Sequence, residues 1–202
     1  MSIICFLRHG QTDWNVKGLM QGIEEIPLNE TGIMQAKQAS SELAQALDGK
    51  SFKFDRIYTS PLSRARVTAQ EFAKKLGDVP VIVDKRLIER DFGILSGKTY
   101  DKNSKAVLQD MTEPSVETAK SLIDRVNSLI NDEVKDNENV IFVTHGAITR
   151  IYAKNAKKAQ GVSEIDIGII GNCALVAYKY DGKEPELIGY DIPTADFNVE
   201  EL

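Results

Sequence analysis

Histidine and cysteine are scarce in this chain, and their scarcity excludes several kinds of site. The 202 residues contain two histidines and two cysteines, Cys5 and Cys173. Both cysteines lie in apolar, strand-like runs, and one pair is too few for a disulfide framework, so we expect two buried, reduced thiols. Because no CxxC, HExxH or Cys/His cluster is present, the sequence predicts no metal site.

Long apolar runs and an excess of positive charge are also lacking. No run approaches the roughly 18 apolar residues that a membrane span requires. The N-terminal run is short, ends at Arg8 and lacks the basic start and cleavage site of a signal peptide. The formal net charge of -5 argues against nucleic acid as a partner. We expect a cytoplasmic protein that binds neither membranes nor nucleic acid.

The composition is that of an ordinary globular protein, with 42% hydrophobic and 27% charged residues. Neither an internal repeat nor a linker-like stretch interrupts the chain, so residues 1–202 are expected to form a single domain. The acidic tail over residues 194–202 is expected to be loose.

Strand-like and helix-like patterns alternate along the chain. Apolar runs bounded by turn residues predict strands over 3–7, 56–59, 79–83, 140–144, 173–180 and 187–190. Amphipathic patterns predict helices with Thr31 and Ser63 as N-caps, others that begin at Pro114-Ser115 and at Ala147, and a weak helix near 104–111. This order indicates an α/β fold, a three-layer α/β/α sandwich with a mostly parallel central sheet. An edge strand near 185–190 is a candidate for pairing in a homodimer.

Both histidines follow an apolar run and precede a glycine. His9 precedes Gly10, and His145 precedes Gly146. Ligands of parallel sheets bind beyond the carboxyl ends of the strands, so both imidazoles are expected at one edge of the sheet. The same edge is expected to receive three more charged side chains: Arg8, Arg64 and Glu89.

This set of side chains fits phosphoryl transfer without a metal. Arginine suits bidentate phosphate binding, and a neutral imidazole can attack phosphorus to form a phosphohistidine. A carboxylic acid can protonate the leaving oxygen and then activate water. Because phosphoryl transfer relies mainly on positioning and on cationic clamping, two arginines, two histidines and one carboxylate fit its needs.

Four segments resemble motifs of the histidine phosphatase superfamily, which includes cofactor-dependent phosphoglycerate mutases and many small phosphatases. They occur in the family's order within residues 3–150: Leu7-Arg8-His9-Gly10-Gln11-Thr12 with Trp14-Asn15, Ser60-Pro61-Leu62-Ser63-Arg64-Ala65, Leu87-Ile88-Glu89-Arg90-Asp91-Phe92-Gly93, and Val143-Thr144-His145-Gly146. An isolated Arg-His-Gly is a weak signal, whereas four ordered motifs are a specific one. The resemblance implies a phosphoglycerate mutase-like fold.

The resemblance also implies a role for each matching residue. His9 is the expected nucleophile, and Glu89 is the expected general acid and base. Arg8, Arg64 and His145 are expected to bind the phosphoryl oxygens. Four further positions are expected to contact the substrate: Asn15, Gln21, Gly22 and the backbone of Gly146.

Local alternatives stay open at this point. Glu89 can instead cap a turn or pair with Arg86 or Arg90, which leaves Asp91 as the rival acid. Asn15 can cap the short turn beside it rather than bind phosphate. Arg150 is expected to form a structural salt bridge.

The favoured activity is hydrolysis of a small phosphomonoester without a cofactor. Residues 98–124 contain four lysines and no arginine, whereas the family's mutases carry paired arginines in a longer insertion there. The segment over residues 21–25, which matches the family's entrance loop, adds Glu24 and Glu25. Their negative charges disfavour the binding of a bisphosphate. A cofactor-dependent phosphoglycerate mutase is the alternative, because Arg90 matches a mutase substrate residue. An inactive phosphate-binding scaffold and an unrelated metal-dependent hydrolase are more distant alternatives.

Overall fold

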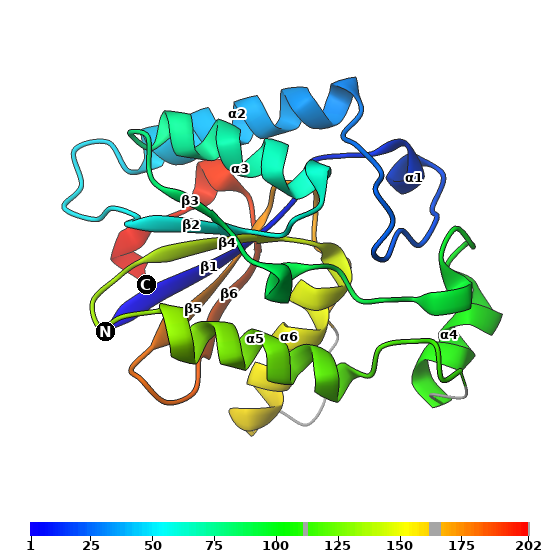
Figure 1. Ribbon diagram of the computed structural model, residues 1–202. Helices are drawn as coiled ribbons and strands as arrows, with labels where there is room; N and C mark the ends of the chain where they lie inside the picture. Colours follow the sequence, from blue (N-terminus) through cyan, green and yellow to red (C-terminus); the bar gives the residue numbers. More distant parts are fainter. Residues whose placement is uncertain (111–112, 162–166, 202) are drawn as a thin grey trace.

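Within residues 1–110, 113–161 and 167–201, which the computed structural model describes, six strands form one sheet. Their order in space is β3-β2-β4-β1-β5-β6 (Figure 1). Their bounds are β1 Ser2–Arg8, β2 Arg56–Thr59, β3 Val81–Val83, β4 Val140–Thr144, β5 Leu175–Tyr180 and β6 Glu186–Ile192. β3, β2, β4 and β1 run parallel to one another, whereas β5 and β6 add antiparallel pairs. The predicted mostly parallel sheet is confirmed.

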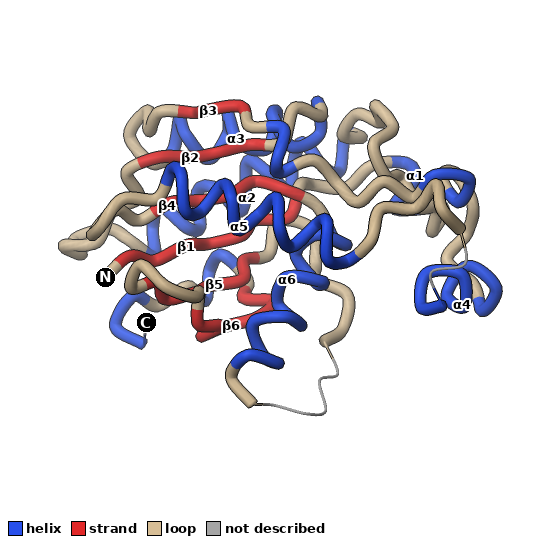
Figure 2. The backbone as a smooth tube through the Cα atoms, turned by 60° about the horizontal axis from the view of Figure 1, so that its bottom comes forward, coloured by secondary structure: helices blue, strands red, loops and turns tan. Residues whose placement is uncertain are grey.

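Helices cover both faces of this sheet, as Figures 1 and 2 show. α2 (Glu30–Ala46) and α3 (Ser63–Lys75) pack on one face, and α5 (Ala119–Glu133) and α6 (Gly146–Ala159) pack on the other. The predicted three-layer sandwich is therefore the fold. Two shorter helices, α1 (Asp13–Val16) and α4 (Lys102–Asp110), lie beyond the sheet. None of the helices in the described ranges has the length and apolar character needed to cross a membrane.

β1 separates two hydrophobic cores because successive side chains of a strand point to opposite faces. Ile4 and Phe6 belong to the core under α5 and α6, whereas Ile3, Cys5 and Leu7 belong to the core under α2 and α3. All five side chains are buried, which explains why the strand reads as one continuous apolar run.

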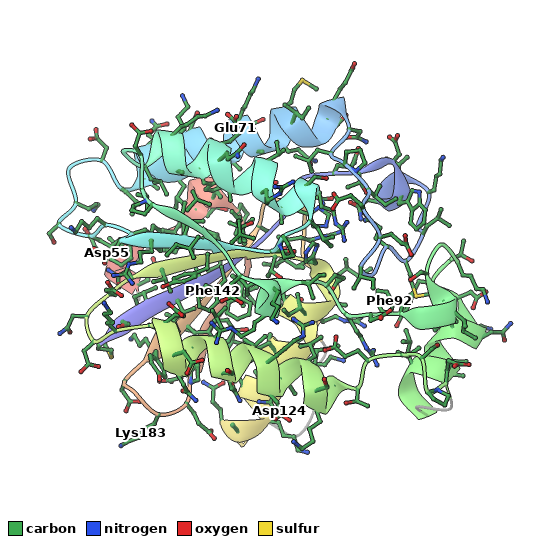
Figure 3. The ribbon with its side chains drawn as sticks, viewed as in Figure 1. Asp55, Glu71, Phe92, Asp124, Phe142 and Lys183 are labelled. Atoms are coloured by element: carbon green, nitrogen blue, oxygen red, sulfur yellow. The ribbon has the colours of Figure 1, made fainter. Side chains whose placement is uncertain are left out.

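Aromatic rings fill the core on the α5 and α6 side. Phe6 packs against Phe142, Tyr152 and Tyr178, with ring centroids 5.1 to 5.4 Å apart. Phe142 is labelled within the sheet in Figure 3. These contacts hold β1 against β4, α6 and β5, and β1 and β4 are the strands that the two histidines follow.

Three helices have a different N-cap from the one that the sequence predicts. α3 has Leu62 rather than Ser63 at its N-cap, and Ser63 is its first helical residue. Asn29 rather than Thr31 caps α2, because its Oδ1 accepts a first-turn N–H at 2.8 Å. α5 begins later than predicted, and its N-cap is Thr118 rather than Pro114 or Ser115.

Other ends shift by one or two residues. The predicted strands over 79–83 and 173–180 shorten to β3 and β5, and Cys173 adopts a left-handed φ of 59° just before β5. α6 begins one residue before Ala147. The weak helix expected near 104–111 is α4, and residue 111 lies outside the described residues.

The tail is not loose, contrary to the prediction. Thr194 and Phe197 are each 3% exposed. The Phe197 ring packs against Phe52 and Phe54, with centroids 6.2 and 5.9 Å away. The acidic composition of the tail therefore gives no sign that Phe197 anchors it to the apolar core. Residue 202 lies outside the described part.

Candidate active site

The carboxyl ends of β1 and β4 bring the two histidines together. The strand register pairs Arg8 with Thr144, the residues that directly precede the histidines. The ring centroids of His9 and His145 lie 5.1 Å apart. In Figure 1 these strand ends lie on the side of the sheet nearest α1 and α4.

His9 is a neutral imidazole whose proton lies on Nδ1. The side chain is 2% exposed, and its Nδ1–H donates to the carbonyl of Gly10 at 2.6 Å. Burial, followed by the positive charges of Arg64 and Arg8, lowers the pKa of His9 well below its ordinary value. Nε2 therefore carries a lone pair at neutral pH.

His145 is also buried and neutral, but both of its ring nitrogens are engaged. Nδ1 accepts from Nε of Arg64 at 3.2 Å, so the proton lies on Nε2, which donates to Oγ of Ser60 at 2.8 Å. Burial, Arg64 and His9 lower the pKa of His145 well below its ordinary value. The expected phosphoryl contact of His145 requires one of these two bonds to open.

Arg64 lies fully buried in the first turn of α3 and ties the site to the entrance loop. Nη1 donates to the carbonyl of Glu24 at 2.6 Å, and Nη2 donates to the carbonyl of Gly22 at 2.8 Å. Burial lowers the pKa of Arg64 to about 10, although the charge of Glu89 opposes the shift. The guanidinium stays charged at neutral pH and carries more N–H groups than its side-chain contacts use.

Arg8 offers an unsatisfied donor. One terminal nitrogen donates to the carbonyl of Ile170, whereas the buried Nε has no hydrogen-bond partner among the described residues. Burial lowers the pKa of Arg8, and the charge of Glu89 opposes that shift. A Cβ on Gly146 would stand 3.4 Å from this Nε. An unpaired buried donor costs about 1–3 kcal/mol, which an anion bound there would relieve.

Glu89 lies over the first turn of α6. The side chain is 7% exposed; Oε2 accepts the backbone N–H of Ala147 at 3.0 Å, and Oε1 accepts that of Ile148 at 3.0 Å. Oε1 also accepts the backbone N–H of Arg90 at 2.8 Å. These three donors suit a carboxylate, and they occupy the first-turn amides of α6 in the structure.

The structure shows the contacts of three charged residues whose roles the sequence left open: Asp91, Arg86 and Arg150. Asp91 closes its own turn, because its Oδ1 accepts the backbone N–H of Gly93 at 2.8 Å. Arg86 pairs with Asp84 rather than with Glu89. The guanidinium of Arg150 lies 6.0 Å from the ring centroid of a tyrosine, Tyr100.

Asn15 has the capping role that the sequence left open. Its Oδ1 accepts the backbone N–H of Thr12 at 3.1 Å, and Thr12 Oγ1 in return accepts the backbone N–H of Asn15. A phosphate contact of the Asn15 amide nitrogen stays a prediction. Gln21 is buried, and its Oε1 accepts Oγ1–H of Thr12 at 3.0 Å, so it supports the entrance loop from inside.

Two glycines let the His9 segment approach α2. A Cβ on Gly10 would stand 2.4 Å from the carbonyl oxygen of Gly32, and a Cβ on Gly32 would stand 2.0 Å from that of Gln11. Neither position accommodates a side chain without a backbone shift. The glycine after His9 thus serves close packing of the loop that holds the imidazole.

Sequence reasoning gave no role to several residues that support the site. Ser60 holds His145, and Nδ2 of Asn172 donates to the carbonyl of His9 at 2.9 Å. Arg125 grips the carboxylate of Glu117 through Nε (2.8 Å) and Nη2 (3.1 Å) and also donates to the carbonyl of Arg86. Ser60 lies inside a recognised motif, but Asn172 and Arg125 come from distant segments with no local signal.

Across the described ranges, no three His, Cys, Asp or Glu side chains converge in a way that could hold a metal ion. The donor set that does converge consists of guanidinium, imidazole and one carboxylate, the groups that bind and protonate phosphate esters.

An Arg-His-Gly strand end, a second histidine and a buried arginine that donates to this second histidine come together at one edge of an α/β sandwich, a set of groups that suits phosphoryl chemistry. The histidine phosphatase superfamily (branch 1) matches residues 4–192. The chain belongs to this superfamily.

Relatives include both phosphatases and mutases. The uncharacterized phosphatase PhoE of Bacillus subtilis is 31% identical over 194 residues, which cover 95% of each chain. The 2,3-bisphosphoglycerate-dependent phosphoglycerate mutase of Parvibaculum lavamentivorans is 30% identical over 198 residues, 90% of this chain and 92% of the mutase. The solved phosphoserine phosphatase of Entamoeba histolytica, in complex with 3-phosphoglyceric acid, is 26% identical with a TM-score of 0.72 and full coverage of both chains (100% and 100%).

Proposed function

We propose that this protein is a metal-independent phosphomonoesterase that hydrolyses a small phosphorylated metabolite through a phosphohistidine on His9. The observation that carries the proposal is the state of His9. Its Nδ1–H is held on the carbonyl of Gly10 at 2.6 Å, and burial beside Arg64 and Arg8 keeps the ring neutral. Nε2 thus has the lone pair that an attacking nitrogen requires, next to two cations that can hold the phosphoryl oxygens.

In the first step, Nε2 of His9 forms a bond to phosphorus while the P–O bond of the ester breaks. Arg8 and Arg64 stabilise the negative charge on the oxygens of the phosphoryl group in flight. Glu89, as the carboxylic acid, gives its proton to the leaving alcohol oxygen. The products are a free alcohol, phosphohistidine and the Glu89 carboxylate.

In the second step, water attacks phosphorus and its proton passes to the Glu89 carboxylate. The P–N bond breaks, its electron pair returns to Nε2, and inorganic phosphate leaves. Glu89 accepts the amides of Ala147 and Ile148 in the structure, so one of its oxygens has to turn from an amide toward the leaving oxygen. His145 joins the clamp when its Nε2–H turns from Ser60 to a phosphoryl oxygen.

Hydrolysis is favoured over transfer to a second substrate by the charges around the site. Residues 98–124 carry no arginine, and Glu24 and Glu25 stand in the entrance loop. The phosphatase PhoE and the phosphoserine phosphatase among the relatives support the same choice. A mutase is the second candidate, because a phosphoglycerate mutase is 30% identical over most of the chain and Arg90 is present.

The test is phosphate release from para-nitrophenyl phosphate and from a panel of natural phosphomonoesters, including phosphoserine and 3-phosphoglycerate, in excess EDTA. His9→Gln is the matched variant, because it keeps a hydrogen-bonding side chain and removes the nucleophile. Rapid quench with labelled substrate should trap an acid-labile, base-stable phosphoryl group on the wild type and none on His9→Gln.

Each outcome separates the candidates. Release in EDTA that depends on His9 supports the phosphatase. Labelled phosphohistidine that gives up its phosphoryl group only to an added phosphoglycerate, which becomes a labelled bisphosphoglycerate, favours the mutase. Loss of activity in EDTA, or retained activity in His9→Gln, contradicts the mechanism.

A further inference from the structure

The entrance loop over residues 21–25 is fastened to the first turn of α3. Oε1 of Glu25 accepts the backbone N–H of Ser63 at 2.8 Å. The carbonyls of Gly22 and Glu24 accept from the two terminal nitrogens of Arg64 at 2.8 and 2.6 Å. The loop therefore meets α3 at the residue that would clamp the phosphoryl group.

α3 needs this contact because it begins without a cap of its own. Its N-cap residue is Leu62, whose side chain makes no capping hydrogen bond. The first N–H groups of a helix lack partners within the helix, and a carboxylate there is favoured by the helix dipole. Desolvation alone would raise the pKa of Glu25, but hydrogen bonds from Ser63 and the charges of Arg64 and Arg66 lower it.

The opposite side of the loop packs against the segment that follows Glu89. Gly22 has a left-handed φ of 52°, and a Cβ there would stand 3.1 Å from Oγ of Ser96 and 3.3 Å from the carbonyl of Arg90. The loop thus fills the space between α3 and residues 90–96. Its place fixes the distance between the phosphoryl clamp and the acid-bearing segment.

We propose that Glu25 is a positioning residue that latches the entrance loop onto α3 and thereby holds Arg64 in the orientation that receives the phosphoryl group. Glu25 acts through Ser63 and through the loop carbonyls, and it does not touch the reacting atoms. The effect on KM rests on the proposed function, whereas the effect on the loop does not.

The latch acts on an equilibrium between a docked and a released loop. If only the docked form binds substrate, the apparent dissociation constant rises as the docked fraction falls. Saturating substrate pulls the loop back into place, so kcat stays unchanged. We expect Glu25→Ala to raise KM about fivefold, which is about 1 kcal/mol at 25 °C and typical of a lost helix cap.

The first test measures the contact between Glu25 and Ser63 in the absence of substrate. Amide hydrogen exchange at Ser63 is measured in the ligand-free protein for the wild type, Glu25→Ala and Glu24→Ala. Glu24 is the matched control, because it carries the same charge one residue earlier and contributes its backbone carbonyl rather than its side chain. We expect faster exchange at Ser63 and across residues 21–25 in Glu25→Ala, with Glu24→Ala close to the wild type and the same far-UV spectrum in all three.

The second test separates KM from kcat with para-nitrophenyl phosphate, and it uses inorganic phosphate as a competitive inhibitor. Glu25→Ala should raise KM and the inhibition constant of phosphate together, while Glu25→Gln, which keeps an acceptor oxygen, should restore most of the affinity. Equal exchange at Ser63 in the two alanine variants would overturn the latch. Faster exchange with unchanged KM and phosphate affinity would overturn the positioning role.

Failure of the proposed function looks different from failure of this inference. A wild type that hydrolyses no ester contradicts the phosphatase proposal. In that case the exchange at Ser63 still decides the latch, and phosphate binding to the ligand-free protein still decides its effect on Arg64.

Discussion

Oε2 of Glu89 accepts the backbone N–H of Ala147 at 3.0 Å, so the acid proposed for the reaction also caps the helix that follows the second histidine. The N-cap residue of α6 is His145, whose side chain makes no capping hydrogen bond. α3 has the same arrangement, with Leu62 at its N-cap and the carboxylate of Glu25 accepting the backbone N–H of Ser63. Both helices at the site are capped by carboxylates from other segments, the entrance loop and the segment that follows β3.

Glu89→Gln should slow the hydrolysis of alkyl phosphates far more than that of para-nitrophenyl phosphate. An alkoxide is a poor leaving group and needs the proton, whereas nitrophenolate leaves without one. General acid catalysis of this kind contributes about 10²–10⁴-fold, so we expect a loss of that size for an alkyl ester and about tenfold or less for the nitrophenyl ester. Single-turnover rates on the two esters check this, and an equal loss on both would contradict the proton-donor role.

The stability of the protein should fall as the pH drops below about 6.5. His9 and His145 have lowered pKa values in the folded state, so the unfolded chain binds more protons between those values and the ordinary one. The free energy of unfolding then decreases by up to about 1.4 kcal/mol per pH unit for each histidine, and neither histidine contributes a slope above the ordinary pKa. Urea unfolding from pH 7.5 to 5.5 checks this, with a His9→Gln, His145→Gln double variant as the reference. A wild-type slope no steeper than that of the double variant would refute the linkage.

Tyr178→Phe should leave the protein as stable as the wild type or more stable. The hydroxyl of Tyr178 is buried and has no hydrogen-bond partner within the described residues, so its removal relieves a desolvation cost. Tyr152→Phe is the matched control, because the Tyr152 hydroxyl donates to Oδ1 of Asn127 at 2.7 Å. We expect the control to lose about 1 kcal/mol of unfolding free energy in urea titrations. A larger loss in Tyr178→Phe than in Tyr152→Phe would contradict the assignment.

Gly32→Ala should disturb the His9 segment. The added Cβ would stand 2.0 Å from the carbonyl oxygen of Gln11, so the backbone has to shift. We expect a loss of about 1–3 kcal/mol in stability and a fall in kcat/KM as the imidazole moves. Gly168→Ala is the control, because an added Cβ there meets no atom of the described residues within 4 Å beyond its two chain neighbours. Equal effects of the two substitutions on thermal unfolding and turnover would contradict this account of the close approach.

The sequence predicts the sheet and the meeting of the two histidines well, because both depend on local and periodic signals. A buried run such as the one before His9 has to form a strand inside a sheet, and Gly10 marks its end. Parallel strands then bring their carboxyl ends to one edge, as β1 and β4 do. The fold class and the neighbourhood of His9 and His145 follow from these rules alone.

The supports of the site could not be predicted in the same way, because they are contacts between segments far apart in the chain. Nothing near Asn172 indicates that its amide holds the carbonyl of His9. The cap of α3 comes from Glu25, although Ser63 is the local candidate. Phe197 anchors a tail whose composition alone is typical of a loose end. Each of these contacts depends on the packed structure rather than on local propensity.

The position of β1 in the sheet affects how the protein can fold during its synthesis on the ribosome. β1 is the first strand to be made, but its two neighbours, β4 and β5, begin at Val140 and Leu175. A nascent chain that stops before Val140 therefore contains His9 without the strand that precedes His145, and its β1 segment has neither of its sheet partners. The native sheet can form around β1 only late in synthesis, because its pairings join segments far apart in the sequence.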